Sequence, residues 1–239
     1  MASSDRRKVA VVTGGSQGLG FAITEALVRA GWAIVVDARR AERLAGAADL
    51  LGSGAAVVAI AGDVTDPAHR AALVDAASRL GPVDLVVNNA SALGRVPLEH
   101  VLDLDADAWR ATFDVNVIAP FALVAALAPN LGEGATILNV TSDAAVEPYE
   151  RWGGYGSSKA ALEHASRILA AERPDLRVLV VDPGDMRTEM HQAAFPGEDI
   201  SDLPEPSVAV PGILALIGGD QPSGRYLARA VPVVDGTAA

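Results

Sequence analysis

The sequence of 239 residues contains no cysteine. This absence excludes a disulfide framework, a thiolate metal site and a cysteine nucleophile at the same time. Lysine is scarce as well, because only Lys8 and Lys159 occur among the 19 basic residues and arginine supplies the rest. A single lysine far inside so arginine-rich a chain invites a specific role for Lys159.

Positive charge is also scarce, since 19 basic against 30 acidic residues leave a net charge of −11. Such a surface does not displace the counterions of nucleic-acid phosphates, so we expect no nucleic-acid partner. We also expect no membrane span, because no apolar run approaches the roughly 18 residues that crossing requires. The first apolar run soon reaches Thr13, unlike a signal peptide, and we expect a cytoplasmic protein. The four histidines show no metal-ligand spacing, so no metal site is predicted. We expect His69 and His100 to lie on the surface.

Apolar segments rich in valine and isoleucine alternate with alanine-rich segments of helical spacing. The predicted strands are Lys8–Thr13, Ala33–Asp37, Ala55–Ala61, Val83–Asn88, Ala135–Thr141, Arg177–Val181 and, from a weaker pattern, Leu227–Val234. The predicted helices are Gly18–Ala30, Ala41–Leu51, Pro67–Leu80, Ala106–Ala128 and Gly156–Ala171. Strands that are nearly continuous apolar runs, without alternation, suit a sheet covered on both faces. Their alternation with helices predicts an α/β fold with a doubly wound parallel β-sheet flanked by helices on both faces.

The predicted organisation is a single domain, 1–239, because no internal repeat or low-complexity linker divides the chain. We expect residues 1–7 to form a flexible N-terminus. The composition shifts once, at Phe195–Pro211, toward proline, glycine and acidic residues, which indicates a surface segment. We expect residues 185–211 to form a flap over a substrate.

A glycine-rich segment follows the first predicted strand and runs into the first predicted helix, with the sequence Thr13-Gly14-Gly15-Ser16-Gln17-Gly18-Leu19-Gly20. Glycines in isolation often make only a turn, which is the simpler interpretation. Between a strand and a helix, however, they let the backbone approach a pyrophosphate at the helix N-terminus. The position of the segment therefore favours a Rossmann-type dinucleotide site.

The spacing T-G-x-x-x-G-x-G resembles that of the short-chain dehydrogenase/reductase family, in its compact single-domain branch. Further motifs in the family's order extend the resemblance over residues 8–190. Asp63-Val64 is similar to the pair that contacts adenine. Asn88-Asn89-Ala90 is similar to the start of N-N-A-G, although Ser91 replaces the glycine. Pro183-Gly184 with Thr188 is similar to the P-G-x-x-x-T motif that holds the nicotinamide amide.

The resemblance also implies which residues contact the cofactor. They are Thr13, Gly14, Ser16, Gln17, Gly18, Leu19, Gly20, Ala38, Arg39, Arg40, Asp63, Val64, Asn89, Ala90, Tyr155, Lys159, Pro183, Gly184 and Thr188.

The end of the second strand bears on the choice between NAD and NADP. An acid there binds the ribose 2′-hydroxyl of NAD, whereas an arginine accommodates the 2′-phosphate of NADP. Aligned from Thr13, the discriminating position falls on Ala38, with Arg39 and Arg40 following. Because successive strand residues face opposite ways, Asp37 points away from the ribose if Ala38 points toward it. We therefore expect NADP(H) to be favoured over NAD(H).

Four residues match the family's catalytic tetrad: Asn116, Ser142, Tyr155 and Lys159. Tyr155 and Lys159 are four residues apart on a predicted helix, so they share one face. A neighbouring ammonium is expected to lower the tyrosine pKa from its ordinary value of about 10. Ser142 follows the fifth strand, at the sheet edge where open α/β folds place their sites. The simpler interpretations are a solvated helix face, a turn cap at Ser142 and a buried hydrogen-bonding side chain at Asn116.

Taken together, these residues imply a reversible hydride transfer between nicotinamide C4 and a carbonyl or alcohol carbon. Tyr155 serves as general acid/base, Ser142 holds the substrate oxygen, and Asn116 holds a water behind Lys159. Three alternatives stay open. They are a non-catalytic NADP-binding regulator on the same fold, an NAD-dependent alcohol dehydrogenase, and a sugar-nucleotide epimerase or dehydratase.

The expected partners are a small carbonyl or alcohol substrate and a second copy of the chain. The substrate pocket is expected from residues 91–98, 143–152 and the flap. In the family, the helices corresponding to Ala106–Ala128 and Gly156–Ala171 form a homodimer interface. A homotetramer through the last strand is possible in the family, but Arg225–Val234 lacks the family's glycine-closed ending.

Overall fold

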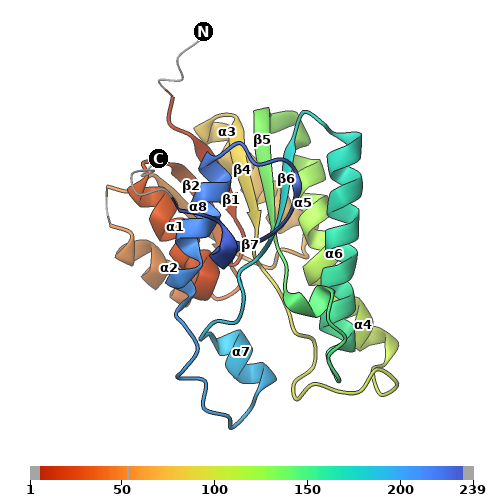
Figure 1. The fold of residues 1–239 in the computed structure, drawn as a ribbon. Coiled ribbons are helices and arrows are strands. Elements are labelled where there is room, and N and C mark those ends of the chain that lie inside the picture. The colour runs from red at the N-terminus through yellow and green to blue at the C-terminus, as the bar shows by residue number, and fades with distance from the viewer. Residues whose placement is uncertain (1–5, 53, 234–239) are drawn as a thin grey trace.

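A seven-stranded, wholly parallel β-sheet organises the molecule (Figure 1). The computed structural model describes residues 6–233 except Ser53. The strands lie in the order β3-β2-β1-β4-β5-β6-β7, and every neighbouring pair is parallel. Their bounds are β1 Val9–Val12, β2 Ala33–Ala38, β3 Val57–Ala61, β4 Val83–Asn88, β5 Leu131–Val140, β6 Arg177–Asp182 and β7 Gly224–Leu227. The predicted doubly wound sheet is confirmed, with its strand order reversing between β1 and β4.

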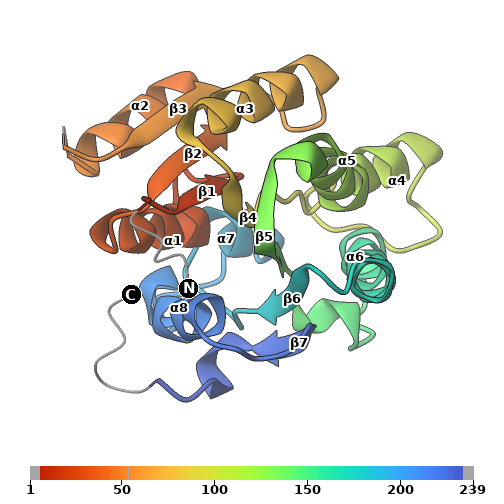
Figure 2. The same ribbon diagram turned by 90° about the horizontal axis from the view of Figure 1, so that it is seen from above.

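Helices cover both faces of the sheet (Figure 2). One face carries α1 Gly18–Arg29, α2 Ala41–Leu50 and α8 Val210–Gly218. The other carries α3 Pro67–Leu80, α5 Ala119–Leu127 and α6 Gly153–Glu172. Two shorter helices, α4 Ala106–Phe113 and α7 Glu189–Ala194, lie beyond the carboxyl edge of the sheet. Because both flank this edge, they are placed to border a site there.

The hydrophobic core has two parts, one on each face of the sheet. Alternation along β1 shows the division, since Ala10 and Val12 belong to one part whereas Val9 and Val11 belong to the other. Removal of such side chains from water is the main force that holds helices on a sheet. The core therefore fixes the carboxyl ends of the central strands, from which the candidate site residues project.

The C-terminal region departs most from the sequence-based expectations. The predicted strand Leu227–Val234 is wrong over its described part, because β7 ends at Leu227 and a 3₁₀ turn follows at Ala228–Ala230; Val234 lies outside the described residues. Within the described part of the chain, β6 is the one strand that pairs with this short edge strand. Helix α8 was not predicted, and it begins at Val210 inside the expected flap 185–211. Its buried residue Ile213 joins the core beside α1, so the last two residues of that flap belong to a packed helix.

The predicted helix Ala106–Ala128 is interrupted in the structure. A π-helical turn, Asp114–Ile118, separates α4 from α5. The whole helical stretch Ala106–Asn130 is apolar and long enough to cross a membrane by length and composition alone. The expectation that no run approaches such a length is therefore wrong. In the structure this stretch packs Leu123 and Leu127 into the core on the sheet.

The N-terminal segment 1–7 was expected to be flexible. Residues 1–5 lie outside the described part of the chain. Arg6 donates hydrogen bonds to both carboxylate oxygens of Asp84, and the same carboxylate accepts the backbone N–H of Val9. This contact ties the start of β1 to β4.

Candidate active site

The glycine segment forms a tight loop between β1 and α1. Gly14 and Gly18 have φ angles of +69° and +56°, which side chains rarely tolerate. A Cβ on Gly20 would lie 2.4 Å from the Gly14 carbonyl oxygen and 2.4 Å from Asn89 Nδ2. At Gln17 no side chain caps α1, so the first N–H groups of the helix are left to an external acceptor. The loop therefore suits a pyrophosphate.

Thr13 and Asn89 hold the glycine loop against the end of β4. Thr13 Oγ1 accepts the backbone N–H groups of Asn89 and Ala90, each at 3.1 Å. Asn89 Nδ2 in turn donates to the carbonyl oxygens of Thr13 and Gly14, at 2.9 and 3.1 Å. Thr13 and Gly20 thus lie behind the loop and contact the segment around Asn89. The other predicted loop residues line the cleft.

A cleft of about 1660 Å³ runs along the carboxyl edge of the sheet. It begins over the glycine loop and continues past Ser142 and Tyr155 to the flap. Among the predicted residues, three do not line it: Thr13, Gly20 and Asn116. The predicted residues that do line it are Gly14, Ser16, Gln17, Gly18, Leu19, Ala38, Arg39, Arg40, Asp63, Val64, Asn89, Ala90, Ser142, Tyr155, Lys159, Pro183, Gly184 and Thr188.

At the end of β2, Asp37 is held in protein contacts whereas Arg39 and Arg40 are open to the cleft. Asp37 is buried, with Oδ1 accepting the Gly14 N–H at 2.8 Å and Oδ2 lying 2.9 Å from Nε2 of His69. The sequence predicted His69 at the surface, but the structure buries it. Its contact with Asp37 Oδ2, together with the Gly14 N–H on Oδ1, occupies both oxygens of that carboxylate. Arg39 and Arg40 line the cleft, and among the described residues neither forms an ion pair, whereas Arg43 is paired with Glu189.

Asp63 borders the same end of the cleft. Burial acts to raise its pKa, but hydrogen bonds from the backbone and hydroxyl of Thr65 outweigh burial and lower the pKa, assisted by the charge of Arg39. The glycine loop, the helix start without a side-chain cap, and two arginines that form no ion pair within the described residues fit a nicotinamide dinucleotide. These residues would hold its pyrophosphate and its adenosine ribose.

Ser142, Tyr155 and Lys159 meet on the opposite side of the cleft, as the sequence predicted. Ser142 lies two residues after the end of β5, whereas Tyr155 and Lys159 lie one turn apart on α6. Lys159 Nζ donates to the carbonyl oxygen of Val140 at 2.8 Å and lies 5.6 Å from the Tyr155 ring centroid. Ser142 Oγ donates to Asp143 Oδ1 at 2.9 Å and accepts the Ala144 N–H at 3.2 Å. Ser142 therefore both caps a turn and faces the cleft.

Burial controls the ionisation of the tyrosine and the lysine. It raises the pKa of Tyr155 to about 12, and hydrogen bonding to Ser142 and Ser91 opposes the rise only in part. Burial also lowers the pKa of Lys159 to about 8. The expected lowering of the Tyr155 pKa is therefore wrong for the chain's own groups. Loss of solvation outweighs the nearby ammonium, and that ammonium is directed at a carbonyl oxygen.

Asn116 lies in the π-helical turn, buried behind the cleft. Its Nδ2 donates to the Ala92 carbonyl oxygen and to Ser158 Oγ, at 2.8 and 2.9 Å. Its Oδ1 accepts from the Ala92 N–H and from Ser91 Oγ, at 2.8 and 3.1 Å. The side chain thus anchors the loop after β4. A water behind Lys159 would have to be held by the backbone of Asn116, and this role stays a prediction.

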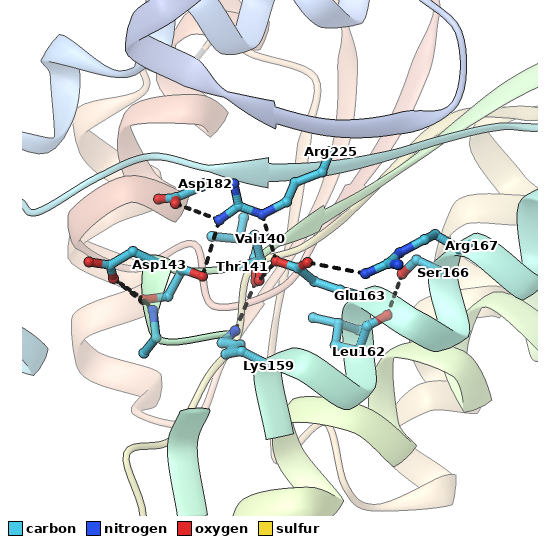
Figure 3. A network of polar contacts seen from close by, with 12 residues as sticks. Val140, Thr141, Asp143, Lys159, Leu162, Glu163, Ser166, Arg167, Asp182 and Arg225 are labelled. Atoms are coloured by element: carbon cyan, nitrogen blue, oxygen red, sulfur yellow. Dashed lines mark hydrogen bonds and ion pairs between the residues drawn. The ribbon is translucent and has the colours of Figure 1, made fainter. Parts of the chain in front are cut away.

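A buried ionic network joins Glu163 of α6 and Asp182 of β6 to Arg225 of β7 (Figure 3). Glu163, one turn after Lys159 on α6, accepts from Thr141 Oγ1 at 2.8 Å and from Arg225 Nε at 2.9 Å. Arg167 approaches the same carboxylate from the surface, at 3.7 Å. Glu163 therefore connects α6 to Thr141, the residue that precedes Ser142.

Arg225 extends the network to the loop that follows β6. Its Nη2 donates to Asp182 Oδ2 at 2.8 Å and to the backbone oxygen of Ser142 at 3.4 Å. Asp182 Oδ1 accepts the N–H of Gly184, at 2.9 Å, in the predicted nicotinamide loop. The Arg225 guanidinium thus connects the loop that carries Ser142 to the loop that carries Gly184.

Sequence reasoning did not find Glu163, Asp182 or Arg225. Asp182 immediately precedes the Pro183-Gly184 motif, and Glu163 follows Lys159 at a spacing of four on the same helix face. The positions of Asp182 and Glu163 next to known motifs could have marked them as candidates. Nothing in the sequence around Arg225 indicates its role, because its place beside them depends on where β7 pairs with β6. Among the described residues, no three His, Asp or Glu side chains form a group that would hold a metal ion.

Comparison with known proteins agrees with this geometry. The short chain dehydrogenase family model matches residues 8–199. An uncharacterized oxidoreductase of Mycobacterium tuberculosis is 38% identical over 199 residues, which cover 81% of this chain and 75% of that protein. The short-chain dehydrogenase/reductase FrzI of a Cladobotryum species is 34% identical over 228 residues, covering 88% and 86%.

Solved structures show the same architecture over nearly the whole chain. The alcohol dehydrogenase of Thermococcus sibiricus, complexed with 5-hydroxy-NADP, is 28% identical with a TM-score of 0.81, covering 93% of this chain and 96% of that one. A putative short chain dehydrogenase of Escherichia coli, complexed with NADPH, is 28% identical with a TM-score of 0.86, covering 94% and 97%. The fold, the glycine loop and these relatives lead to one conclusion: the chain belongs to the short-chain dehydrogenase/reductase family of oxidoreductases.

Proposed function

We propose that this oxidoreductase is an NADP(H)-dependent carbonyl reductase with Tyr155 as its general acid/base. The observation that carries the proposal is the convergence of Ser142, Tyr155 and Lys159 on one cleft that also passes over the glycine loop. The nicotinamide, when bound, supplies or accepts the hydride. The protein orients the substrate oxygen and handles the proton.

Proton transfer falls to the buried tyrosine. In reduction, the Tyr155 hydroxyl gives its proton to the substrate oxygen, which the Ser142 hydroxyl holds in place. A pKa raised to about 12 keeps Tyr155 protonated at neutral pH, which favours reduction. Alcohol oxidation needs the phenolate and therefore becomes faster as the pH rises. Lys159, whose pKa is lowered to about 8, is still mostly charged at neutral pH. Its ammonium there stabilises the phenolate that remains when Tyr155 has given its proton to the substrate oxygen.

Preference for NADP(H) rests on the arginines at the end of β2. Arg39 and Arg40 line the cleft without forming an ion pair among the described residues, and Asp37 is already bonded to His69 and to Gly14. A 2′-phosphate would supply the missing anionic partner, since charge-assisted hydrogen bonds to phosphate are strong. Two relatives bound to NADP-type cofactors are consistent with this preference.

The test is the ketone-dependent oxidation of NADPH and NADH, measured as kcat/KM. We expect a higher value with NADPH for the wild-type enzyme. Arg39→Ala is expected to lower kcat/KM with NADPH by about 10- to 100-fold, since a hydrogen bond to a charged group contributes about 1.5–3 kcal/mol, and to change the value with NADH little. Arg29→Ala, which removes an exposed arginine paired with Glu25, serves as the matched control.

Two outcomes contradict the proposal in different ways. A higher kcat/KM with NADH than with NADPH overturns the cofactor preference alone. Tight binding of NADPH without turnover of any ketone, aldehyde or alcohol overturns the activity and supports a cofactor-binding regulator instead.

We also propose a homodimer in the cytoplasm. The π-turn between α4 and α5 exposes Ile118 by 56%, and α6 exposes Ile168 by 46%. Exposed aliphatic side chains on these two helical segments are consistent with the predicted dimer interface.

A further inference from the structure

Aromatic rings gather at the end of the cleft beyond Tyr155. Trp152, which precedes α6, lies edge-on to Tyr155 with ring centroids 5.6 Å apart. Trp152 also contacts Phe195 of the flap at 5.9 Å and Tyr149 at 6.4 Å. His191 of α7 stacks on Phe195 at 4.8 Å. These rings come from two segments far apart in the sequence and form one continuous wall.

The wall is open to the cleft. Trp152, His191 and Phe195 are half-buried and Tyr149 is exposed, and all four line the cleft. Tyr149 donates its hydroxyl to Asp143 Oδ2 at 2.8 Å, which leaves its ring surface available. Aromatic surfaces of this kind are well suited to a flat ring, by stacking or edge-to-face contact. Because Trp152 lies against Tyr155, a ring attached directly to the reacting carbonyl would lie against Trp152.

Charge at this end of the cleft is acidic. The acidic residues that line it are Asp143, Glu150, Asp182, Asp185, Glu189, Glu198, Asp199, Asp202 and Glu205. Arginines lie beside four of them: Arg225 beside Asp182, Arg43 beside Glu189, Arg187 beside Glu205 and, at 4.0 Å, Arg151 beside Glu150. Within the described residues, no arginine forms an ion pair with Asp143, Asp185, Glu198, Asp199 or Asp202, so negative charge is in excess. The cofactor end, by contrast, carries Arg39 and Arg40. A negatively charged substrate would therefore meet repulsion at the flap.

We infer that the substrate is an aryl ketone without negative charge, which is reduced to the secondary alcohol. This inference rests on the proposed function. A hydride from NADPH forms the new C–H bond at the carbonyl carbon while the C=O π bond breaks. Tyr155 gives the oxygen a proton, which solvent later restores through Lys159. NADPH is oxidised to NADP⁺, the ketone gains two electrons, and its ring packs against Trp152 and Phe195.

The first arm of the test compares substrates of matched size with NADPH as reductant. Acetophenone is expected to have a kcat/KM about tenfold above that of cyclohexyl methyl ketone, because aromatic pairs add about 0.5–1.5 kcal/mol each beyond area burial. The kcat/KM for para-acetylbenzamide is expected to exceed that for para-acetylbenzoate by about tenfold or more at low salt, since like charges repel across an interface. Added salt screens this repulsion and is expected to bring the two kcat/KM values closer together.

The second arm uses Phe195→Leu, which removes a ring from the flap without touching α6. This variant is expected to lower kcat/KM for acetophenone by about fivefold and to leave the value for cyclohexyl methyl ketone nearly unchanged. Phe113→Leu is the matched control, because Phe113 is also half-buried and ring-paired, with Trp109, but does not line the cleft. It is expected to leave both values unchanged.

Each contrary result has its own meaning. Equal kcat/KM values for acetophenone and cyclohexyl methyl ketone overturn the aryl ketone inference and leave the reductase intact. So does a Phe195→Leu variant that lowers both values by the same factor, because that indicates support of the flap and not ring recognition. A faster reaction with para-acetylbenzoate overturns the charge argument. Absence of turnover with every ketone instead overturns the proposed function.

Discussion

Replacement of Tyr155 by phenylalanine is expected to lower kcat for ketone reduction by about 10³-fold, within the range of about 10²- to 10⁴-fold that general acid catalysis contributes. The ring would stay in its buried place against Trp152, so the variant removes the proton and little else. The dissociation constant for NADPH is expected to rise by no more than about tenfold, since one hydrogen bond contributes about 1 kcal/mol. Steady-state kinetics and fluorescence titration measure the two quantities.

Tyr226→Phe provides the matched control for this prediction. Tyr226 lies on β7 and donates its hydroxyl to the Pro222 carbonyl oxygen at 2.7 Å, and it does not line the cleft. The same chemical change there is expected to leave kcat unaltered. A Tyr155→Phe variant with full turnover would contradict the role assigned to the phenol. Lost turnover accompanied by lost cofactor binding would indicate a structural defect.

Replacement of Arg225 by methionine is expected to lower the free energy of unfolding by about 3 kcal/mol, because removal of one partner from a buried ion pair leaves uncompensated charge. The variant would leave Glu163 and Asp182 without their shared guanidinium, although both side chains are at least 96% buried: their exposed fractions are 2% and 4%. Urea unfolding at constant m-value measures the change. Activity is expected to fall as well, since Arg225 also bonds the backbone of Ser142.

A control variant separates the loss of this buried ion pair from the loss of an exposed arginine beside Glu163. Arg167→Met is the control, because Arg167 is 65% exposed and 3.7 Å from Glu163, and exposed pairs contribute about 1 kcal/mol or less. Equal losses for the two variants would show that the network does not depend on Arg225.

Local patterns were sufficient to predict the sheet and to single out most residues of the candidate site. The central strands are nearly continuous apolar runs, interrupted by Asp37 in β2 and by Asp84 and Asn88 in β4, so β1, β2 and β4 were placed within one residue. The glycine loop and the Tyr155–Lys159 pair were predicted because both lie within single short segments. Ser142 was predicted because it lies just past the end of a strand, two residues after Val140.

Features that depend on contacts between distant segments were missed. Helix α8 follows a proline-rich stretch and is held by packing on α1, so its position is set by tertiary structure. His69 looked like a surface residue because its partner, Asp37, is 32 residues away. The Tyr155 pKa was expected in the wrong direction, because the sequence shows the neighbouring lysine but not the degree of burial. Arg225 was missed for the same kind of reason.

The most direct test of carbonyl reduction at this site follows deuterium from nicotinamide C4 of labelled NADPH during reduction of a ketone. If Tyr155, Ser142 and Lys159 serve a carbonyl reductase, mass spectrometry will find the label on the carbinol carbon of the alcohol. The Tyr155→Phe variant will slow this transfer, and the label will still arrive at the same carbon. Label that stays on bound cofactor while the ketone is recovered unchanged would contradict carbonyl reduction by these residues.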